Sequence, residues 1–176
     1  MNNPVLLENL RCIPDFPKKG INFRDVTTLY KNPECMKIMV DEMYELYKDK
    51  EITKIVGIES RGFVMAAALA TKLGAGVVLA RKPGKLPATV IKESFSKEYG
   101  VDTVEMHIDS IDENDVVLIH DDLLATGGTA KATLKLVNHF HPKKVYMNFI
   151  IEITDEGLHG RDCLEKDVEV TTLMVI

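Results

Sequence analysis

Two adjacent carboxylates, Asp121 and Asp122, follow an apolar stretch of sequence and precede a short loop rich in glycine and threonine. The loop comprises Ala125, Thr126, Gly127, Gly128 and Thr129. Glycines let backbone N–H groups turn toward one point, threonines add hydroxyl donors, and the start of a following helix adds partial positive charge. Ligands of parallel sheets bind at the carboxyl ends of strands, so this loop is predicted to hold a phosphate group.

The carboxylates point to a second part of the same ligand. They would repel a phosphate, whereas the vicinal hydroxyls of a ribose can donate hydrogen bonds to them. The alternative is that Asp121 and Asp122 only terminate the strand and cap a turn, but the loop behind them favours the ribose interpretation. The chain contains neither the G-x-x-x-x-G-K-[ST] motif nor the G-x-G-x-x-G motif of the common nucleotide-binding folds.

Cations occur at two further places where apolar stretches end. Ser60 and Arg61 lie between a predicted strand and a predicted helix, which makes a second candidate anion site, and an arginine can make paired contacts with phosphate oxygens. A cluster after the next predicted strand consists of Arg81, Lys82 and Lys85. The alternatives are a surface arginine at the first place and a solvated basic hinge at the second.

These residues need a scaffold, and the order of apolar and periodic segments predicts one. Strands are expected at residues 54–58, 77–80, 115–120, 144–151 and 168–175. Helices are expected after Asn3, after Asn32 to about Tyr47, at residues 63–73 and at residues 129–140, while residues 15–31 are expected to be irregular. The alternation predicts an α/β fold, with a mainly parallel sheet covered by helices on both faces.

The stretch from Arg81 to about Val101 breaks this pattern. It is polar, contains two prolines and two glycines, and shows no helical period. Long connections of this kind inside a compact domain are usually lids or disordered. Residues 103–108 then alternate like a half-exposed strand. We therefore predict a mobile flap over about residues 81–108, hairpin-like at its base.

Length and composition limit the class of protein. The chain has 176 residues, of which 45% are hydrophobic and 28% charged, as expected for one globular domain. Its net charge of −5 argues against broad binding to nucleic acid, and no apolar run is long enough to cross a membrane. Three widely spaced cysteines indicate neither a disulfide framework nor a zinc site. The expected location is the cytoplasm.

The apolar strand, the two aspartates and the Ala-Thr-Gly-Gly-Thr loop resemble the phosphoribosyl pyrophosphate (PRPP) motif of the type I phosphoribosyltransferases. Four further segments are similar to the adenine phosphoribosyltransferases in order and spacing: residues 16–25, 59–63, 81–87 and 98–100. The resemblance covers nearly the whole chain. It implies the type I phosphoribosyltransferase fold, with a twisted sheet, a single domain over residues 1–176, a small hood over about residues 1–30 and the flexible flap.

The resemblance also implies a reaction in which adenine and PRPP give AMP and pyrophosphate, with Mg²⁺ carried by PRPP. It assigns residues 125–129 to the 5′-phosphate and the aspartate pair to the ribose. The residues that it assigns to the pyrophosphate are Ser60, Arg61, Arg81, Lys82 and Lys85. Glu98 is assigned to proton transfer, and Phe23 and Arg24 to adenine. The alternatives are that Glu98 is a surface glutamate and Phe23 a core residue. A homodimer is expected from the resemblance alone.

Two rival functions remain, and the chain departs from the family pattern at three places: the flap between Pro87 and Glu98, Asn22 and His120. A 6-oxopurine enzyme of the same family would resemble its relatives in having a lysine on a late strand, and residues 145–153 contain none. A non-catalytic PRPP-binding regulator would need a surface for nucleic acid, whereas this chain is acidic and retains Glu98. Asn22 stands where relatives commonly have an apolar residue. His120 precedes the aspartate pair, and strand alternation predicts that it is a core residue rather than a catalytic one.

Overall fold

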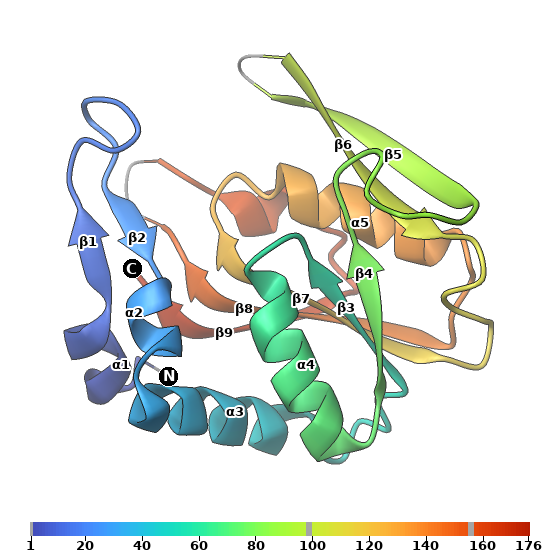
Figure 1. Ribbon diagram of the computed structural model, residues 1–176, viewed down its shortest axis with the longest axis horizontal. Coiled ribbons are helices and arrows are strands. Elements are labelled where there is room, and N and C mark those ends of the chain that lie inside the picture. Colours follow the sequence, from blue (N-terminus) through green and yellow to red (C-terminus); the bar gives the residue numbers. More distant parts are fainter. Residues whose placement is uncertain (1, 98–99, 155–156) are drawn as a thin grey trace.

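A five-stranded parallel sheet forms the centre of the computed structural model, which describes residues 2–97, 100–154 and 157–176. Its strand order is β4-β3-β7-β8-β9 (Figure 1). The strands are β3 (Lys54–Ile58), β4 (Gly76–Ala80), β7 (Val116–Leu124), β8 (Lys144–Glu152) and β9 (Glu169–Val175). All neighbouring pairs in this sheet are parallel, which confirms the predicted α/β class.

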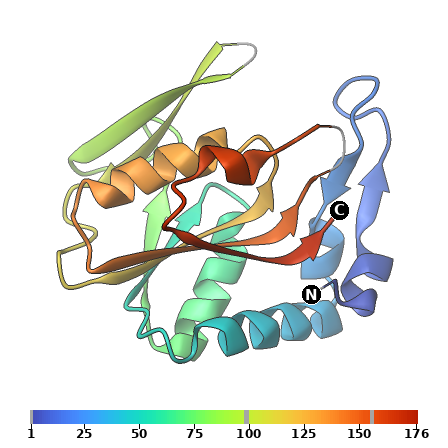
Figure 2. The ribbon, with the colours of Figure 1, turned by 180° about the vertical axis from the view of Figure 1, so that it is seen from behind.

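Helices cover both faces of the sheet. α3 (Pro33–Tyr47) and α4 (Gly62–Leu73) lie on one face, and α5 (Gly128–Asn138) and the short 3₁₀ helix η1 (Gly160–Cys163) lie on the other (Figures 1 and 2). β3 leads into α4 and its neighbour β7 leads into α5, so the chain leaves these two strands toward opposite faces. A crevice is expected at such a switch point, outside the carboxyl ends of the strands.

The ends of the helices follow from local chemistry. Asn3 caps α1 (Pro4–Asn9) by accepting a hydrogen bond from the N–H of Val5 at 3.0 Å. Asn32 caps α3 in the same way through the N–H of Glu34 at 2.9 Å. α4 ends at Gly74, whose φ of 73° is left-handed and therefore suits glycine. These caps and stops confirm the helices that the sequence predicts.

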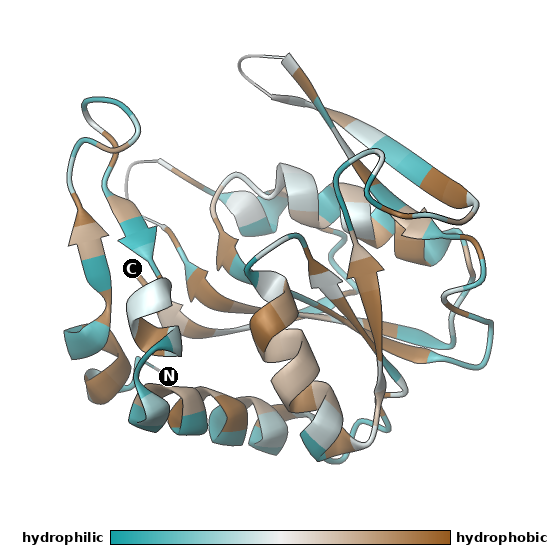
Figure 3. Ribbon diagram, in the orientation of Figure 1, coloured by the Kyte–Doolittle hydropathy of each residue, from teal (hydrophilic) through white to brown (hydrophobic). Residues whose placement is uncertain are grey.

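The core consists of two apolar clusters, one on each face of the sheet. α3 and α4 contribute to the first, which includes Met39, Met43 and Leu69, and α5 contributes to the second, which includes Leu134 and Val137. Figure 3 shows the hydrophobic colour concentrated in the strands of the central sheet and alternating with hydrophilic colour along α3. The methionines of α3 are core residues, because Met39 and Met43 are fully buried.

The N-terminal hood is more regular than the sequence predicts. β1 (Arg11–Ile13) and β2 (Phe23–Asp25) pair as an antiparallel ribbon, and α2 (Thr27–Tyr30) follows. The prediction of an irregular stretch at residues 15–31 was therefore wrong for residues 23–30. A three-residue strand carries no visible period of its own, and its pairing with β1 depends on partners ten to fourteen residues away.

The flap is a hairpin from residue 90 to residue 107, over the part of it that the structure describes, and not only at its base. β5 (Val90–Lys97) and β6 (Gly100–His107) pair from Val90↔His107 to Lys97↔Gly100. β5 packs against α5, on the face of the sheet opposite α4 (Figures 1 and 2). The flap therefore rests on the helix that follows the 125–129 loop.

β7 is longer than predicted and contains the aspartate pair. The strand was expected to end at His120, but its backbone stays paired with β8 through Asp121↔Phe149 and Leu123↔Ile151 to Leu124↔Glu152. The sequence prediction was wrong here because Asp is depleted in strands, whereas the pairing of residues 121–124 with the neighbouring strand β8 keeps this part of the chain extended. The carboxylates thus project from the last part of a rigid strand.

Candidate active site

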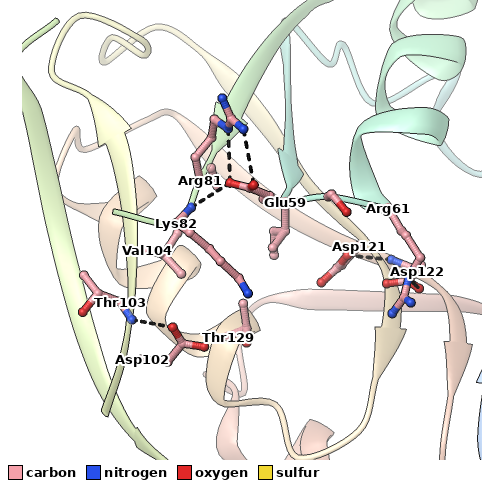
Figure 4. Close-up of a pocket in the computed structure, with 13 residues that line it drawn as sticks. Glu59, Arg61, Arg81, Lys82, Asp102, Thr103, Val104, Asp121, Asp122 and Thr129 are labelled. Atoms are coloured by element: carbon pink, nitrogen blue, oxygen red, sulfur yellow. Dashed lines mark hydrogen bonds and ion pairs between the residues drawn. The ribbon is translucent and has the colours of Figure 1, made fainter. Parts of the chain in front are cut away.

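A cavity of about 390 Å³ opens at the carboxyl ends of β3, β4 and β7, where the switch of connection predicts a crevice. Residues from four parts of the chain meet there (Figure 4). Its lining includes Glu59, Ser60, Arg61, Arg81, Lys82, Asp102, Thr103, Val104, Asp121, Asp122 and Thr129. Seven of these residues, which lie at or after the ends of three different strands, were predicted from the sequence as site residues: Ser60, Arg61, Arg81, Lys82, Asp121, Asp122 and Thr129.

The turn after β3 approaches β7 closely. A Cβ atom on Gly62, the first residue of α4, would lie 2.7 Å from the carbonyl oxygen of His120, so only glycine fits there. This contact brings Arg61 beside the aspartate pair, and its Nε donates to Oδ2 of Asp122 at 2.5 Å. The hydroxyl of Tyr30 donates to the carbonyl of Arg61 at 3.0 Å, which ties the turn to the hood.

The two aspartates have different surroundings. The Asp122 side chain is only 6% exposed and forms an ion pair with Arg61. Among the described residues no cation is bonded to Asp121; its Oδ1 accepts the backbone N–H of Asp122 at 2.9 Å. Burial, followed by the neighbouring Asp122 carboxylate, raises the pKa of Asp121 well above its ordinary range. A ligand hydroxyl at this place would find one carboxylate already bound by arginine and one that is costly to ionise.

Arg81 is held by a carboxylate that sequence reasoning did not single out. Its Nε and Nη2 donate to the two oxygens of Glu59 at 3.1 and 3.3 Å, and the N–H of Lys82 donates to Glu59 at 2.9 Å. Burial acts to raise the pKa of Glu59, but the bonds from Lys82 and Arg81 lower it overall. Glu59 directly follows β3 and directly precedes Ser60, which was predicted as a site residue. This position at the end of a strand is the signal that could have identified Glu59.

The ammonium of Lys82 points into the cavity (Figure 4). Neither a hydrogen bond nor an ion pair engages it within the described part of the chain, in contrast to the guanidinium groups of Arg61 and Arg81. Lys85 does not line the cavity: its side chain is exposed, and its carbonyl accepts a bond from Arg81 at 3.1 Å. The three cations of this cluster therefore have different surroundings: Arg81 is paired with Glu59, Lys82 enters the cavity, and Lys85 is exposed.

Thr129 is the residue of the 125–129 loop that lines the cavity, and residues 125–128 do not line it. Gly127 has a φ of 77° and directly precedes α5, so its left-handed backbone turns the chain into the helix. Gly128 is covered by the flap, because a Cβ atom there would be 3.0 Å from the ring of Phe95. This arrangement places the N-terminus of an eleven-residue helix at the edge of the cavity.

The hood reaches the site by way of Phe23. The Arg61 guanidinium lies over the Phe23 ring at 5.5 Å, and the Phe16 ring meets Phe23 edge-on at 5.2 Å. Arg24 donates to Sγ of Cys12 at 2.8 Å across the β1–β2 ribbon. Phe23 and Arg24 are thus beside the cavity lining and not part of it, and Asn22 next to them is exposed.

The flap contributes residues that the sequence did not identify. Asp102, Thr103 and Val104 of β6 line the cavity opposite the aspartate pair. Their place is set by the hairpin register, which pairs Phe95 with Asp102 and Ser94 with Thr103, and no local pattern reveals such a register. Glu98, the residue assigned to proton transfer, lies outside the described residues.

His120 is a core residue, as strand alternation predicts. It is completely buried, and its Nδ1 lies 3.0 Å from Oδ1 of Asn148. Its Nε2 has no hydrogen-bond partner among the described residues. Burial lowers the pKa of His120 to about 4, so the ring is neutral at physiological pH and takes no part in the cavity.

Comparisons with known proteins agree with this geometry. A family profile described as the phosphoribosyl transferase domain matches residues 25–167. The chain belongs to the phosphoribosyltransferase family. The adenine phosphoribosyltransferase of Phocaeicola vulgatus is 60% identical over 176 residues, which cover all of both chains.

Solved structures of the family have the same fold. The adenine phosphoribosyltransferase of Rhodothermus marinus is 47% identical, with a TM-score of 0.91 over 98% of this chain and 97% of that one. The enzyme of Giardia lamblia, solved in complex with 9-deazaadenine, is 38% identical, with a TM-score of 0.92 over 100% and 98% of the chains. The predicted family and the type I phosphoribosyltransferase fold are thereby confirmed.

The described part of the chain offers neither a metal cluster nor a membrane-spanning helix. It contains no group of three or more His, Cys, Asp or Glu side chains that could hold a metal ion. Among its helices, none combines the length and the apolar character needed to cross a membrane.

Proposed function

We propose that this phosphoribosyltransferase transfers the 5-phosphoribosyl group of PRPP to adenine and so produces AMP and pyrophosphate in purine salvage. The observation that carries the proposal is the meeting of Asp121, Asp122, Arg61 and Thr129 around one cavity, because these residues suit the ribose and the two phosphate ends of PRPP. The identities to adenine phosphoribosyltransferases over whole chains support adenine as the base.

In this proposal each strand end binds one part of PRPP. The 125–129 loop and the start of α5 bind the 5′-phosphate, and Asp121 and Asp122 bind the ribose hydroxyls. The pyrophosphate lies toward Ser60, Arg61, Arg81, Lys82 and Lys85. The Lys82 ammonium supports this direction, since it enters the cavity without an ion pair among the described residues.

The reaction is a displacement at the anomeric carbon of the ribose. A bond forms between that carbon and N9 of adenine while its bond to the pyrophosphate oxygen breaks. The substrate is PRPP as its magnesium complex, in which the ion offsets part of the pyrophosphate charge. Arg61 and Lys82 stabilise the charge on the leaving group. Glu98 accepts the proton that the purine ring loses as N9 bonds to the ribose, and Phe23 and Arg24 hold the base.

We also propose a cytoplasmic homodimer. All three cysteines are free, which suits a reducing compartment. Val64 on α4 and Val77 and Leu79 on the edge strand β4 are about 40% exposed, and apolar side chains of this size favour burial against a second copy. Sedimentation velocity is expected to give twice the chain mass, and Val77→Lys is expected to shift the protein toward the monomer. A wild-type monomer would contradict this part of the proposal.

The function is tested by a turnover assay with PRPP and Mg²⁺, offering adenine, hypoxanthine, guanine and xanthine separately. AMP formation with adenine alone is the expected result. Turnover of a 6-oxopurine instead would retain the PRPP site and overturn the assignment of the base. PRPP binding without turnover of any base would identify a regulator on the same fold.

A further inference from the structure

The 125–129 loop is backed by a second segment of the chain, η1, which lies beside α5 and is the short red helix in Figure 2. The two backbones touch directly. A Cβ atom on Gly160 would collide with the carbonyl oxygen of Ala125 and lie 3.0 Å from the nitrogen of Gly127. A Cβ atom on Gly127 would in turn collide with the carbonyl oxygen of Gly160 and with Sγ of Cys163. The loop therefore has no room to move back toward η1.

The position of η1 is fixed by Arg161. Its Nε donates to Oε1 of Glu152 at 2.9 Å, its Nη2 donates to Oε2 of the same carboxylate, and its Nη1 donates to the carbonyl of Val170 at 2.7 Å. A planar guanidinium can make this set of bonds at once, whereas a lysine ammonium cannot match its fork geometry.

Glu152 connects this pair to the sheet beside the loop. It is the last residue of β8, its side chain is 9% exposed, and it lies opposite Leu124, which directly precedes the loop. The hydrogen bond from Arg161 lowers the pKa of Glu152, so the pair is charged at neutral pH. Rigid strands on two sides therefore determine where η1, and through it the loop, can lie.

We infer that Arg161, through its pair with Glu152 and the close contact of Gly160, is a positioning residue for the 5′-phosphate. The inference rests on the proposed function, in which the loop binds that phosphate. Arg161 does not line the cavity. It acts by holding the loop backbone in the conformation in which N–H groups converge, so that less of the binding energy is spent on ordering the loop.

A positioning role makes a prediction that general loss of structure does not. The pyrophosphate cations lie on the turns after β3 and β4, which η1 does not touch in any contact described above. A less firmly held η1 should lower the affinity for ligands that carry the 5′-phosphate and leave the affinity for pyrophosphate unchanged. Ribose 5-phosphate and pyrophosphate are suitable probes, because each presents one end of PRPP alone.

The test is calorimetric titration of the full chain with PRPP, ribose 5-phosphate and pyrophosphate. Arg161→Lys keeps the charge and loses the fork, and it is expected to raise the Kd for PRPP and ribose 5-phosphate by about tenfold. The Kd for pyrophosphate is expected to stay within about twofold of the wild-type value. Arg11→Lys is the matched control, since Arg11 makes a similar two-nitrogen pair with the buried Asp25 in the hood. It should leave the affinity for ribose 5-phosphate unchanged.

Gly160→Ala provides a second variant that does not depend on the ion pair. Its methyl group pushes against Ala125, so it should give the same split between the two probes, with thermal unfolding used to show that the variant is folded. Equal affinities in wild type and both variants, or an equal loss for both probes, would overturn the inference alone. A wild-type protein that binds neither PRPP nor ribose 5-phosphate would overturn the proposed function with it.

Discussion

At the scale of single residues, the site holds its charges in pairs before any substrate arrives. Arg61 is bound to Asp122, and Arg81 is bound to Glu59. An arriving pyrophosphate can share these guanidinium groups, which carry more donors than one carboxylate uses. The pairs also keep buried carboxylates from standing alone, which would be costly. The site thus holds both guanidinium groups in ion pairs, while the ammonium of Lys82 has none among the described residues.

The pairing of Arg61 with Asp122 makes a prediction about the ribose. Asp122→Asn keeps the shape of the side chain and removes its charge, so kcat/KM should fall by roughly 100-fold, the value of one or two charge-assisted hydrogen bonds. The melting temperature should change little, because Arg61 is part-exposed and can be solvated. Asp49→Asn, at an exposed position, is the control. Near-normal turnover of Asp122→Asn would exclude the ribose role.

At the scale of elements, the flap is positioned by its contact with α5. The ring of Phe95 packs on Gly128, and Glu93 forms an ion pair with Lys135 at 2.7 Å. Phe95 is paired with Asp102, so this contact also determines where the lining residues of β6 stand. Phe95→Ala removes about 1–2 kcal/mol of apolar contact. It should therefore speed tryptic cleavage within the flap several-fold, lower kcat/KM, and lower the melting temperature by a few degrees.

The control for this prediction lies on the same hairpin. Val101 is 72% exposed, so Val101→Ala removes an apolar side chain from the flap without breaking a packed contact. Equal cleavage rates for the wild type, Phe95→Ala and Val101→Ala would show that the contact with α5 does not hold the flap.

Which elements could be predicted depends on where their stabilising contacts lie. Helices such as α3 were predictable because the Asn32 cap and the apolar spacing are local signals. The extension of β7 through Asp121 and the β1–β2 ribbon were not, because both depend on pairing with distant strands. The same division holds in the site. Motifs identified Arg61 and the loop, whereas Asp102 enters the cavity only through the register of the flap.

At the scale of the whole molecule, the charges of the site are compatible with an acidic chain. The net charge is −5, yet the turns after β3 and β4 bring three cations, Arg61, Arg81 and Lys82, to one cavity. A pocket with a local cluster of cations attracts a small anion, whereas nucleic acid requires a broad basic face. The strand order is what gathers the cluster, because neighbouring parallel strands end at the same edge.

The buried histidine beneath this edge makes the stability of the whole chain depend on pH. His120 has a pKa of about 4 in the folded protein against an ordinary value of 6.5, so below pH 6.5 the unfolded chain binds a proton that the folded chain does not. Unfolding is therefore favoured progressively as the pH falls from 6.5 to 4. The expected loss between pH 7 and pH 5 is roughly 2 kcal/mol of unfolding free energy.

His120→Gln isolates this contribution, because glutamine does not titrate and its amide can still donate to Asn148. The raised pKa of Asp121 acts with the opposite sign, since protonation of that carboxyl favours the folded state as the pH falls, but it is present in both proteins and cancels in their difference. The pKa of Asp25 is about 2, because bonds from Thr27 and Arg11 outweigh burial. The contribution of Asp25 to stability is therefore lost only below the range from pH 7 to pH 5.

Urea unfolding at pH 7 and pH 5 should show that the wild type loses roughly 2 kcal/mol more unfolding free energy than His120→Gln. Parallel losses in the two proteins would show that folding does not lower the pKa of His120.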